Sequence, residues 1–174
     1  GIIACASYEA KAIDIKRGVS LWDAQRRLPE LVVLPSDYET YSTFSKRMFE
    51  VMRRFTPEVQ EYSIDEGFAD ITGMDRYFKC SYKEIAQRMQ KAVCEELGIS
   101  VSIGLSLTKS LAKIASDYRK PHGLTAVEGR HIHLFLERIP VPDVWGFGKS
   151  SQELLRKRCI HTALDFVLQD EEWV

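Results

Sequence analysis

The 174-residue chain has the composition of an ordinary globular protein, with 45% hydrophobic and 28% charged residues and a formal net charge of −1. This composition excludes a disordered chain, and the longest apolar runs are far shorter than the roughly 20 residues that span a bilayer. No signal-peptide pattern opens the sequence, so a cytoplasmic protein without a membrane partner is expected.

Turn residues interrupt the first 35 residues of the chain, which predicts a small unit of short helices and strands. Residues 1–6 form an apolar run that predicts a strand already under way, so we expect the chain to be a fragment of a longer protein. Residues 7–11 predict a turn or the start of a short helix. The apolar spacing of residues 21–28 fits a short amphipathic helix, and residues 31–35 predict a strand that ends at a proline.

A long amphipathic helix is predicted over residues 38–55, ending near Pro57. Its apolar positions recur at helical spacing: Tyr41, Phe44, Met48, Val51, Met52 and Phe55. Four basic residues lie off this stripe. A solvated face explains them more simply than a binding site does.

Two adjacent carboxylates, Asp65 and Glu66, interrupt two segments of strand-like alternation. The β-branched and aromatic residues on either side, with Gly67 at the bend, predict a hairpin whose tip carries both acids. Adjacent strand residues point to opposite faces, so both acids can meet one ion only where a bend breaks the alternation. Neighbouring carboxylates repel unless a cation lies between them, and Mg²⁺ is a usual hard cation for such a pair. The alternative is a solvated turn, which is the commoner setting of a lone Asp-Glu pair.

The segment after the hairpin alternates helix and strand signals. Residues 85–97 carry a helical apolar stripe that Gly98 closes at the expected C-terminal position. Residues 99–105 alternate as a half-buried strand, and residues 124–127 predict a last strand. This order is compatible with a ferredoxin-like α+β arrangement.

Between these two strands, Ser106 is the expected cap of a helix that runs to Asp117. Lys109 and Lys113 lie off the apolar stripe of this helix, so both are expected near the surface. A basic turn that contains Lys120 follows the helix.

Short helices are predicted for the C-terminal quarter of the chain. Residues 139–145 and 150–158 predict two helices joined by a turn that contains Gly146 and Gly148, and Thr162 is the expected cap of one more helix. Two glycines let backbone N–H groups approach a phosphate at the N-terminus of the second helix. By itself, a Gly-x-Gly sequence is more often just a tight turn.

The formal charge changes sign along the chain. Residues 35–75 sum to −5 and residues 76–127 to +5. Residues 1–34 sum to +1 and residues 128–174 to −2. An acidic metal site beside a basic phosphate-binding surface produces such a pattern, and so does ordinary surface charge. The net charge alone argues weakly against nucleic acid as a partner. Four widely spaced cysteines encode neither a zinc site nor a disulfide framework.

Four stretches of the sequence resemble, in family order, the motifs of Y-family DNA polymerases, the translesion class. Y-S-I-D-E-G-F-A-D-I-T-G resembles the central palm motif, and S-Y-E-A-K-A-I-D-I-K-R-G-V-S resembles the fingers motif. S-L-T-K-S-L-A-K-I-A-S-D-Y-R-K-P-H-G-L resembles the next palm motif, and the Gly-x-Gly segment resembles the helix-hairpin-helix of the thumb. In the fingers motif, Lys11 replaces the usual arginine and so lacks the bidentate fork for phosphate.

The resemblance implies an α+β fold of three parts. Residues 1–35 would form a small fingers subdomain, residues 36–127 a ferredoxin-like palm without its N-terminal strand, and residues 128–174 a partial helical thumb with the helix-hairpin-helix.

The resemblance also implies template-directed nucleotidyl transfer with two Mg²⁺ ions, in which a primer 3′-hydroxyl attacks a deoxynucleoside triphosphate. The implied site residues are Asp65 and Glu66 for catalysis and metal binding, Tyr8, Lys11 and Lys120 for the nucleotide, and Gly146, Gly148 and Lys149 for DNA. The implied partners are primer-template DNA, deoxynucleoside triphosphates and a sliding clamp that binds a segment outside this chain. From the residues alone, Tyr8 and Lys11 are an exposed aromatic and a solvated lysine.

In the family, the first metal-binding aspartate lies on an N-terminal strand that this chain does not contain. Residues 1–174 alone are therefore expected to be inactive. One alternative is a non-catalytic DNA-binding remnant of such a polymerase. Another is a different palm-type enzyme, such as a nucleotide cyclase, against which the Lys120 and Gly-x-Gly motifs argue.

Overall fold

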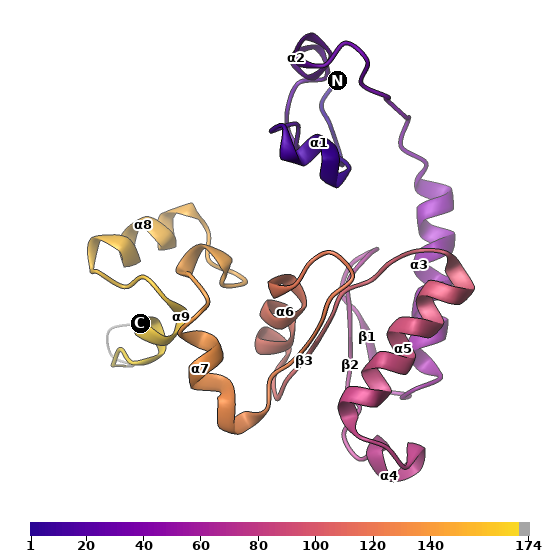
Figure 1. The fold of residues 1–174 in the computed structure, drawn as a ribbon, viewed down its shortest axis with the longest axis vertical. Coiled ribbons are helices and arrows are strands. Elements are labelled where there is room, and N and C mark those ends of the chain that lie inside the picture. Colours follow the sequence, from indigo (N-terminus) through magenta and orange to yellow (C-terminus); the bar gives the residue numbers. More distant parts are fainter. Residues whose placement is uncertain (171–174) are drawn as a thin grey trace. The chain divides into compact units, whose positions relative to one another are not determined.

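A computed structural model describes residues 1–170 (Figure 1). The chain folds as two compact units, of which the first is residues 1–42 and the second begins at residue 43. The last four residues of the predicted thumb lie outside the described residues. The predicted division at residues 35 and 127 stays a prediction.

The first unit contains two short helices, α1 (Tyr8–Ala12) and α2 (Leu21–Arg27). Helix α2 matches the helix predicted there, and α1 forms where a turn or the start of a short helix was predicted. The Ser7 hydroxyl accepts a hydrogen bond from the Ala10 N–H at 3.2 Å and so caps α1. The strand predicted for residues 1–6 is wrong, because this segment makes only an isolated antiparallel bridge, between Ile2 and Ser20. Helix α2 begins directly after Ser20, so the segment that could extend the ladder is already helical.

The strand predicted for residues 31–35 is also wrong. Residues 31–37, all of them described, form neither helix nor strand, and Val32 and Leu34 are 82% and 81% exposed. Apolar and β-branched residues favour a strand only where a neighbouring strand and a packed face are available. This connector has no paired strand beside it among the described residues.

The second unit contains the remaining described elements, and α3 extends across the boundary between the two units. Its first half consists of α3 (Tyr38–Arg53), β1 (Val59–Glu61), β2 (Gly67–Ala69), α4 (Met74–Phe78), α5 (Tyr82–Leu97), β3 (Ile103–Leu105), α6 (Lys109–Tyr118) and β4 (Leu124–Ala126). Its second half consists of the 3₁₀ turn η1 (Gly129–His131), α7 (Ile132–Leu136), the 3₁₀ turn η2 (Val141–Asp143), α8 (Lys149–Lys157) and α9 (Ala163–Val167). The predicted α+β class is confirmed.

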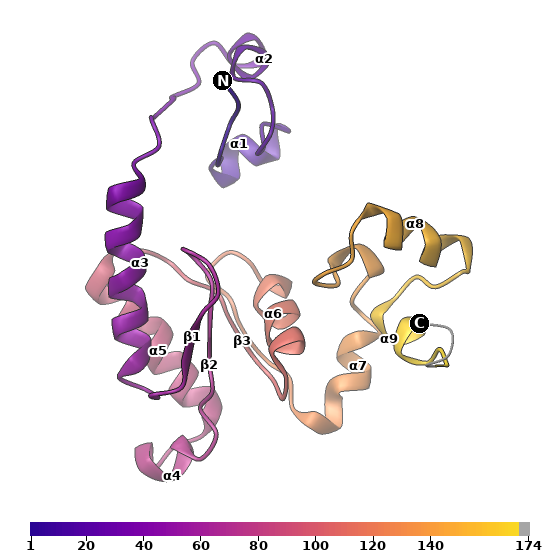
Figure 2. The same ribbon diagram turned by 180° about the vertical axis from the view of Figure 1, so that it is seen from behind.

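The strands of the described residues pair as two separate two-stranded sheets. β1 and β2 form an antiparallel hairpin in which Gln60 lies opposite Phe68. β3 and β4 are parallel, with Gly104 opposite Thr125, and α6 connects them. Figures 1 and 2 both show α6 beside β3.

Helices α3 and α5 bury their predicted stripes against each other and against the hairpin. Phe49 and Val93 share one core cluster and are 1% and 2% exposed, and Ile85 is fully buried in a second cluster. Phe49 was not part of the predicted stripe. The left-handed φ of +66° at Gly98 ends α5, as the sequence predicts.

Helix α6 packs directly on the backbone of β3 at Gly104. A Cβ at this position would overlap the Ala112 carbonyl and the Ser116 N–H of α6, so the close approach requires glycine. The predicted cap of α6 is wrong: the Thr108 hydroxyl caps it by accepting from the Leu111 N–H at 3.3 Å. The Ser106 hydroxyl instead donates to the Val127 carbonyl at 3.2 Å and ties the ends of β3 and β4 together.

The C-terminal helices surround two apolar clusters. The helix predicted for residues 139–145 is wrong, because only the single 3₁₀ turn η2 forms there. Pro140 and Pro142 lack the N–H groups that an α-helix needs. Helix α8 and the Thr162 cap of α9 are as predicted, and Thr162 and Asp165 form a reciprocal capping box. Among the described residues, no helix has the length and apolar character to cross a membrane.

Candidate active site

The two adjacent acids lie in the loop that joins β1 to β2. The Tyr62 and Ser63 N–H groups both donate to the Glu66 carbonyl, at 3.0 and 2.9 Å, and close this loop. The bend is therefore at residues 63–65, and Gly67, predicted as the bend, is already the first residue of β2. A Cβ at Gly67 would overlap the ring of Phe49 in α3, so the glycine lets the hairpin pack closely on that helix.

Asp65 and Glu66 differ in their surroundings. Asp65 is exposed, and its carboxylate accepts a hydrogen bond from the Ser63 hydroxyl at 2.9 Å. Glu66 is half-buried, and its carboxylate lies 3.1 Å from the ammonium group of Lys113 in α6. Both acids occupy the loop rather than a regular strand, so the alternation that separates neighbouring side chains does not constrain them.

Lys113 forms the centre of a network of charges. Its side chain is 13% exposed, so it is more covered than the predicted surface position implies, although both of its partners are partly open to solvent. Besides Glu66, it contacts the carboxylate of Asp117 at 2.7 Å, and Lys120 contacts the other oxygen of Asp117 at 2.5 Å. The charges along Glu66, Lys113, Asp117 and Lys120 thus alternate in sign.

Burial and ion pairing have opposite effects on the two central groups. Burial lowers the pKa of Lys113, but its hydrogen bonds and charge interactions with Asp117 and Glu66 outweigh burial and raise the pKa. Burial raises the pKa of Asp117, but Lys113 and Lys120 outweigh it and lower the pKa. Both groups are therefore charged at neutral pH.

Lys120 lies in the turn between α6 and β4, beside a cis Lys120–Pro121 peptide bond. The turn closes tightly, because a Cβ at Gly123 would overlap the Arg119 carbonyl. Through Asp117 and Lys113, Lys120 belongs to the same network as Glu66. The structure therefore brings a predicted nucleotide-binding lysine together with a predicted metal ligand.

Tyr8 and Lys11, the other predicted nucleotide-binding residues, lie in α1 of the first unit. The Lys11 ammonium is 4.9 Å from the centroid of the Tyr8 ring, which is cation–π distance, and Tyr8 is 54% exposed. The two side chains therefore contact each other and are open to solvent.

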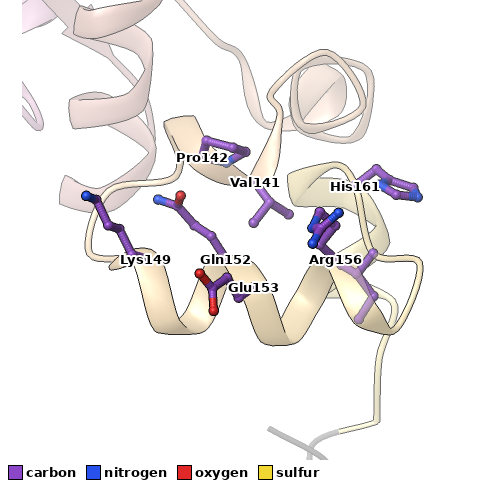
Figure 3. A pocket seen from close by; sticks show the side chains of 8 residues that line it. Val141, Pro142, Lys149, Gln152, Glu153, Arg156 and His161 are labelled. Atoms are coloured by element: carbon purple, nitrogen blue, oxygen red, sulfur yellow. The ribbon is translucent and has the colours of Figure 1, made fainter.

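The predicted DNA-binding loop precedes α8. Gly146 has a φ of +94°, in the left-handed region that favours glycine, and Gly148 is the N-cap residue of α8. The Gln152 side chain donates to the Phe147 carbonyl at 2.8 Å and fixes the loop to the helix. Lys149 is exposed at the rim of a pocket of about 310 Å³, which Figure 3 shows between α8 and η2, with Arg156 also on its wall.

Sequence reasoning missed an aromatic cluster next to the acidic loop. Tyr62, Phe68 and Trp145 pack with ring centroids 5.4 to 6.0 Å apart, mostly edge to face. Two of the rings belong to the hairpin, and the third precedes Gly146. Helical or strand periodicity cannot connect residues so far apart in the chain. The one available signal was that two aromatic residues, Tyr62 and Phe68, flank the acidic pair in the sequence.

The acidic loop offers the kind of ligands that Mg²⁺ prefers. Mg²⁺ is usually bound by one or two carboxylates together with substrate phosphates and water. Asp65 is open to solvent and Glu66 is partly so, which fits that mode of binding. The described residues contain no group of three or more His, Cys, Asp or Glu side chains that could enclose an ion by themselves.

Comparison with known proteins identifies relatives along the whole chain. The chain is 34% identical over its full length to "DNA polymerase IV 1" of Halalkalibacterium halodurans, of which it covers 42%. It is 38% identical over 171 residues, 98% of the chain, to "DNA polymerase IV 1" of Bacillus subtilis, of which it covers 41%. The chain thus spans less than half the length of these relatives.

Solved structures share the fold. DinB from Sulfolobus solfataricus superimposes with a TM-score of 0.87 at 25% identity, over 98% of this chain and 50% of that one. The insertion ternary complex of Dbh DNA polymerase has the same TM-score and identity, over 98% of this chain and 49% of that one. The model of the impB/mucB/samB family matches residues 1–117, which include both acids of the hairpin loop and the Lys113–Asp117 pair of α6. The resemblance to Y-family polymerases is thereby confirmed, and this chain belongs to the impB/mucB/samB family.

Proposed function

We propose that this chain supplies catalytic and substrate-binding residues for template-directed DNA synthesis past lesions, by transfer of a nucleotide from a deoxynucleoside triphosphate to a primer 3′-hydroxyl. The observation that carries this proposal is the charge network that joins Glu66 of the acidic loop to Lys120 through Lys113 and Asp117. This network joins the acidic loop and a lysine in one connected group of side chains, which supports the proposal. The names of the relatives, DNA polymerase IV 1, support the same activity.

In this proposal, Asp65 and Glu66 are two of the carboxylates that would hold two Mg²⁺ ions together with the substrate phosphates. Bound there, the ions would lower the pKa of the attacking hydroxyl and neutralise charge on the leaving pyrophosphate. Lys120 binds the triphosphate, and Tyr8 and Lys11 contribute from α1. Gly146, Gly148 and Lys149 bind the DNA backbone.

The decisive experiment substitutes the two acids in the full-length protein. Asp65→Asn and Glu66→Gln are expected to abolish primer extension, because each removes a metal ligand but keeps the shape of the side chain. The exposed Asp65→Asn is expected to leave the unfolding temperature unchanged, whereas Glu66→Gln also weakens the contact with Lys113 and is expected to lower it slightly while the protein stays folded. Asp70→Asn is the matched control, since Asp70 lies at the end of β2, where its carboxylate accepts from the Thr72 N–H at 2.9 Å. Extension by either loop variant near the parent rate would remove the pair from the mechanism. Metal and DNA binding by the parent without any extension would instead favour a non-catalytic remnant.

The nucleotide contacts are tested separately. Lys120→Ala is expected to raise the KM for nucleotide about tenfold with little change in DNA affinity. A hydrogen bond to a charged group contributes about 1.5–3 kcal/mol, and the existing pair of Lys120 with Asp117 offsets part of this gain. Lys11→Arg is expected to leave the KM unchanged or lower it, because arginine restores a bidentate fork. Equal losses of nucleotide and DNA affinity in Lys120→Ala would move this lysine to the DNA surface.

DNA binding by the loop before α8 is expected to depend on salt but not on sequence, because the proposed contacts go to the phosphate backbone. The cytoplasm is the compartment that we propose for this activity. The sliding clamp stays a predicted partner.

A further inference from the structure

Three aromatic rings join the acidic loop to the loop before α8. Tyr62 lies at the start of the acidic loop, three residues before Asp65, and its ring centroid is 5.4 Å from that of Trp145 at an interplanar angle of 74°. Phe68 in β2 completes the group, 5.9 Å from Tyr62 and 6.0 Å from Trp145. We refer to Tyr62, Phe68 and Trp145 as the aromatic clasp.

Each side of the aromatic clasp is anchored in a different part of the second unit. Trp145 packs against the apolar cluster of the C-terminal helices, which includes Ile114 of α6 and Phe135 of α7. Tyr62 is held by its N–H, which donates to the Glu66 carbonyl at 3.0 Å. Contact between Trp145 and Tyr62 therefore connects the C-terminal helical core directly to the backbone of the acidic loop.

A second contact supports the hairpin side of the clasp. The Lys109 ammonium lies 5.9 Å from the centroid of the Phe68 ring and also donates a hydrogen bond to the side chain of Gln60 in β1. The ring of Phe68 thus lies near Lys109 of α6 and near the ring of Trp145. The same helix carries Lys113.

Trp145 is followed immediately by Gly146, whose φ of +94° turns the chain toward the N-terminus of α8. Trp145 and the N-terminus of α8 are therefore separated by only three residues of this loop. Aromatic pairs of this geometry contribute about 0.5–1.5 kcal/mol each beyond the area that they bury, and this cluster contains three.

We propose that Trp145 is a positioning residue. Through the aromatic clasp, it fixes the position of the acidic loop relative to the loop before α8. DNA bound to the loop before α8 is thereby aligned with the carboxylates of the acidic loop. This inference rests on the proposed function. In it, Trp145 and Tyr62 touch neither nucleotide nor metal. They act through the backbone of residues 62–66.

The test measures kcat, the KM for nucleotide and the Kd for primer-template DNA separately in the full-length protein. Trp145→Ala and Tyr62→Ala are each expected to lower kcat about tenfold to a hundredfold, because small displacements of catalytic groups have effects of that size. The Kd for DNA is expected to change less than twofold, since Gly148 and Lys149 are intact. The double variant is expected to lose no more than the larger single loss, because both changes break one contact.

Conservative variants separate positioning from simple loss of structure. Trp145→Phe and Tyr62→Phe keep a ring, so they are expected to restore most of kcat. Tyr77→Ala is the matched control, since Tyr77 and Phe78 form an edge-to-face pair at 5.0 Å in α4, outside the clasp, and Tyr77 is 78% exposed. Its removal is expected to leave kcat unchanged.

The side chain of Tyr62 is largely exposed, so Tyr62→Ala tests the proposal even if Trp145→Ala does not fold. A kcat equal to that of the parent in folded Tyr62→Ala would overturn the proposal. So would additive losses in the double variant, or a fall in DNA affinity that accounts for the whole effect. If instead Asp65→Asn extends primers at the parent rate, the proposed function fails, and that result is independent of the clasp variants.

Discussion

Replacing Lys113 by methionine tests whether the central lysine of the charge network stabilises the fold. Methionine keeps an unbranched side chain of similar length but removes the charge and all three N–H donors. The substitution breaks the contacts of Lys113 to Glu66 at 3.1 Å and to Asp117 at 2.7 Å. Asp117 keeps Lys120 as a partner, whereas the Glu66 carboxylate has no other ion pair among the described residues.

The size of the effect follows from burial. Exposed ion pairs contribute about 0–1 kcal/mol, and breaking a fully buried pair costs about 3–5 kcal/mol. Lys113 is 13% exposed, but its partners are 36% and 40% exposed and can regain water when the lysine is removed. We therefore expect Lys113→Met to lower the free energy of unfolding by about 2 kcal/mol, between these limits.

Urea unfolding at neutral pH measures this change, provided that the dependence on denaturant is the same for parent and variant. Lys91→Met is the matched control, because Lys91 makes a comparable pair with Glu95 in α5, at 3.7 Å, with both side chains well exposed. Its effect is expected to stay below about 0.5 kcal/mol. Equal losses in the two variants, or no loss in Lys113→Met, would refute the reasoning that burial makes the Lys113 network stabilising.

Two further predictions concern the fold. Gly104→Ala is expected to lower the free energy of unfolding by about 3 kcal/mol or more, because the new Cβ would overlap the backbone of α6. Gly148→Ala is the control and should cost less than about 1 kcal/mol, because the space around Gly148 is open. Similar losses for the two variants in urea unfolding would contradict this reasoning. Asp165→Asn is expected to cost about 0.5–1 kcal/mol at pH 7 by weakening the capping box of α9. Hydrogen bonds from Thr162 and His161 lower the pKa of Asp165 from its ordinary 3.8, so the ionised group stabilises the fold above that value and loses its effect as the pH falls through the lower folded-state pKa. Variant and parent should therefore converge in stability near pH 2, and a difference that persists there would count against the capping box.

Elements specified by local patterns were predicted well. The stripes of α3 and α5 repeat over four turns, and the acidic loop of Asp65 and Glu66 is enclosed by two segments that pair with each other. The helix predicted over residues 139–145 failed because two prolines override apolar spacing. The strands predicted at residues 1–6 and 31–35 failed because a strand requires a partner that a local pattern does not reveal.

The surroundings of the acids were not predictable in the same way. Lys113 lies off the apolar stripe of α6, which indicates a surface position. Its side chain is nevertheless only 13% exposed, and its partner Glu66 is 47 positions earlier in the sequence. Trp145 and Tyr62 are separated still further. Such contacts depend on how the hairpin, α6 and the C-terminal helices pack, and one sequence carries no direct signal for them.

The ion pair between Lys120 and Asp117 has a consequence for how the protein would release a bound anion. A phosphate that reaches Lys120 competes with a carboxylate already 2.5 Å away, so binding gains less than it would at an unpaired lysine. When the phosphate leaves, Asp117 recaptures the lysine and no uncompensated charge is exposed. The protein thus carries its own competing anion, an arrangement that limits the affinity of Lys120 for the nucleotide that we propose binds there.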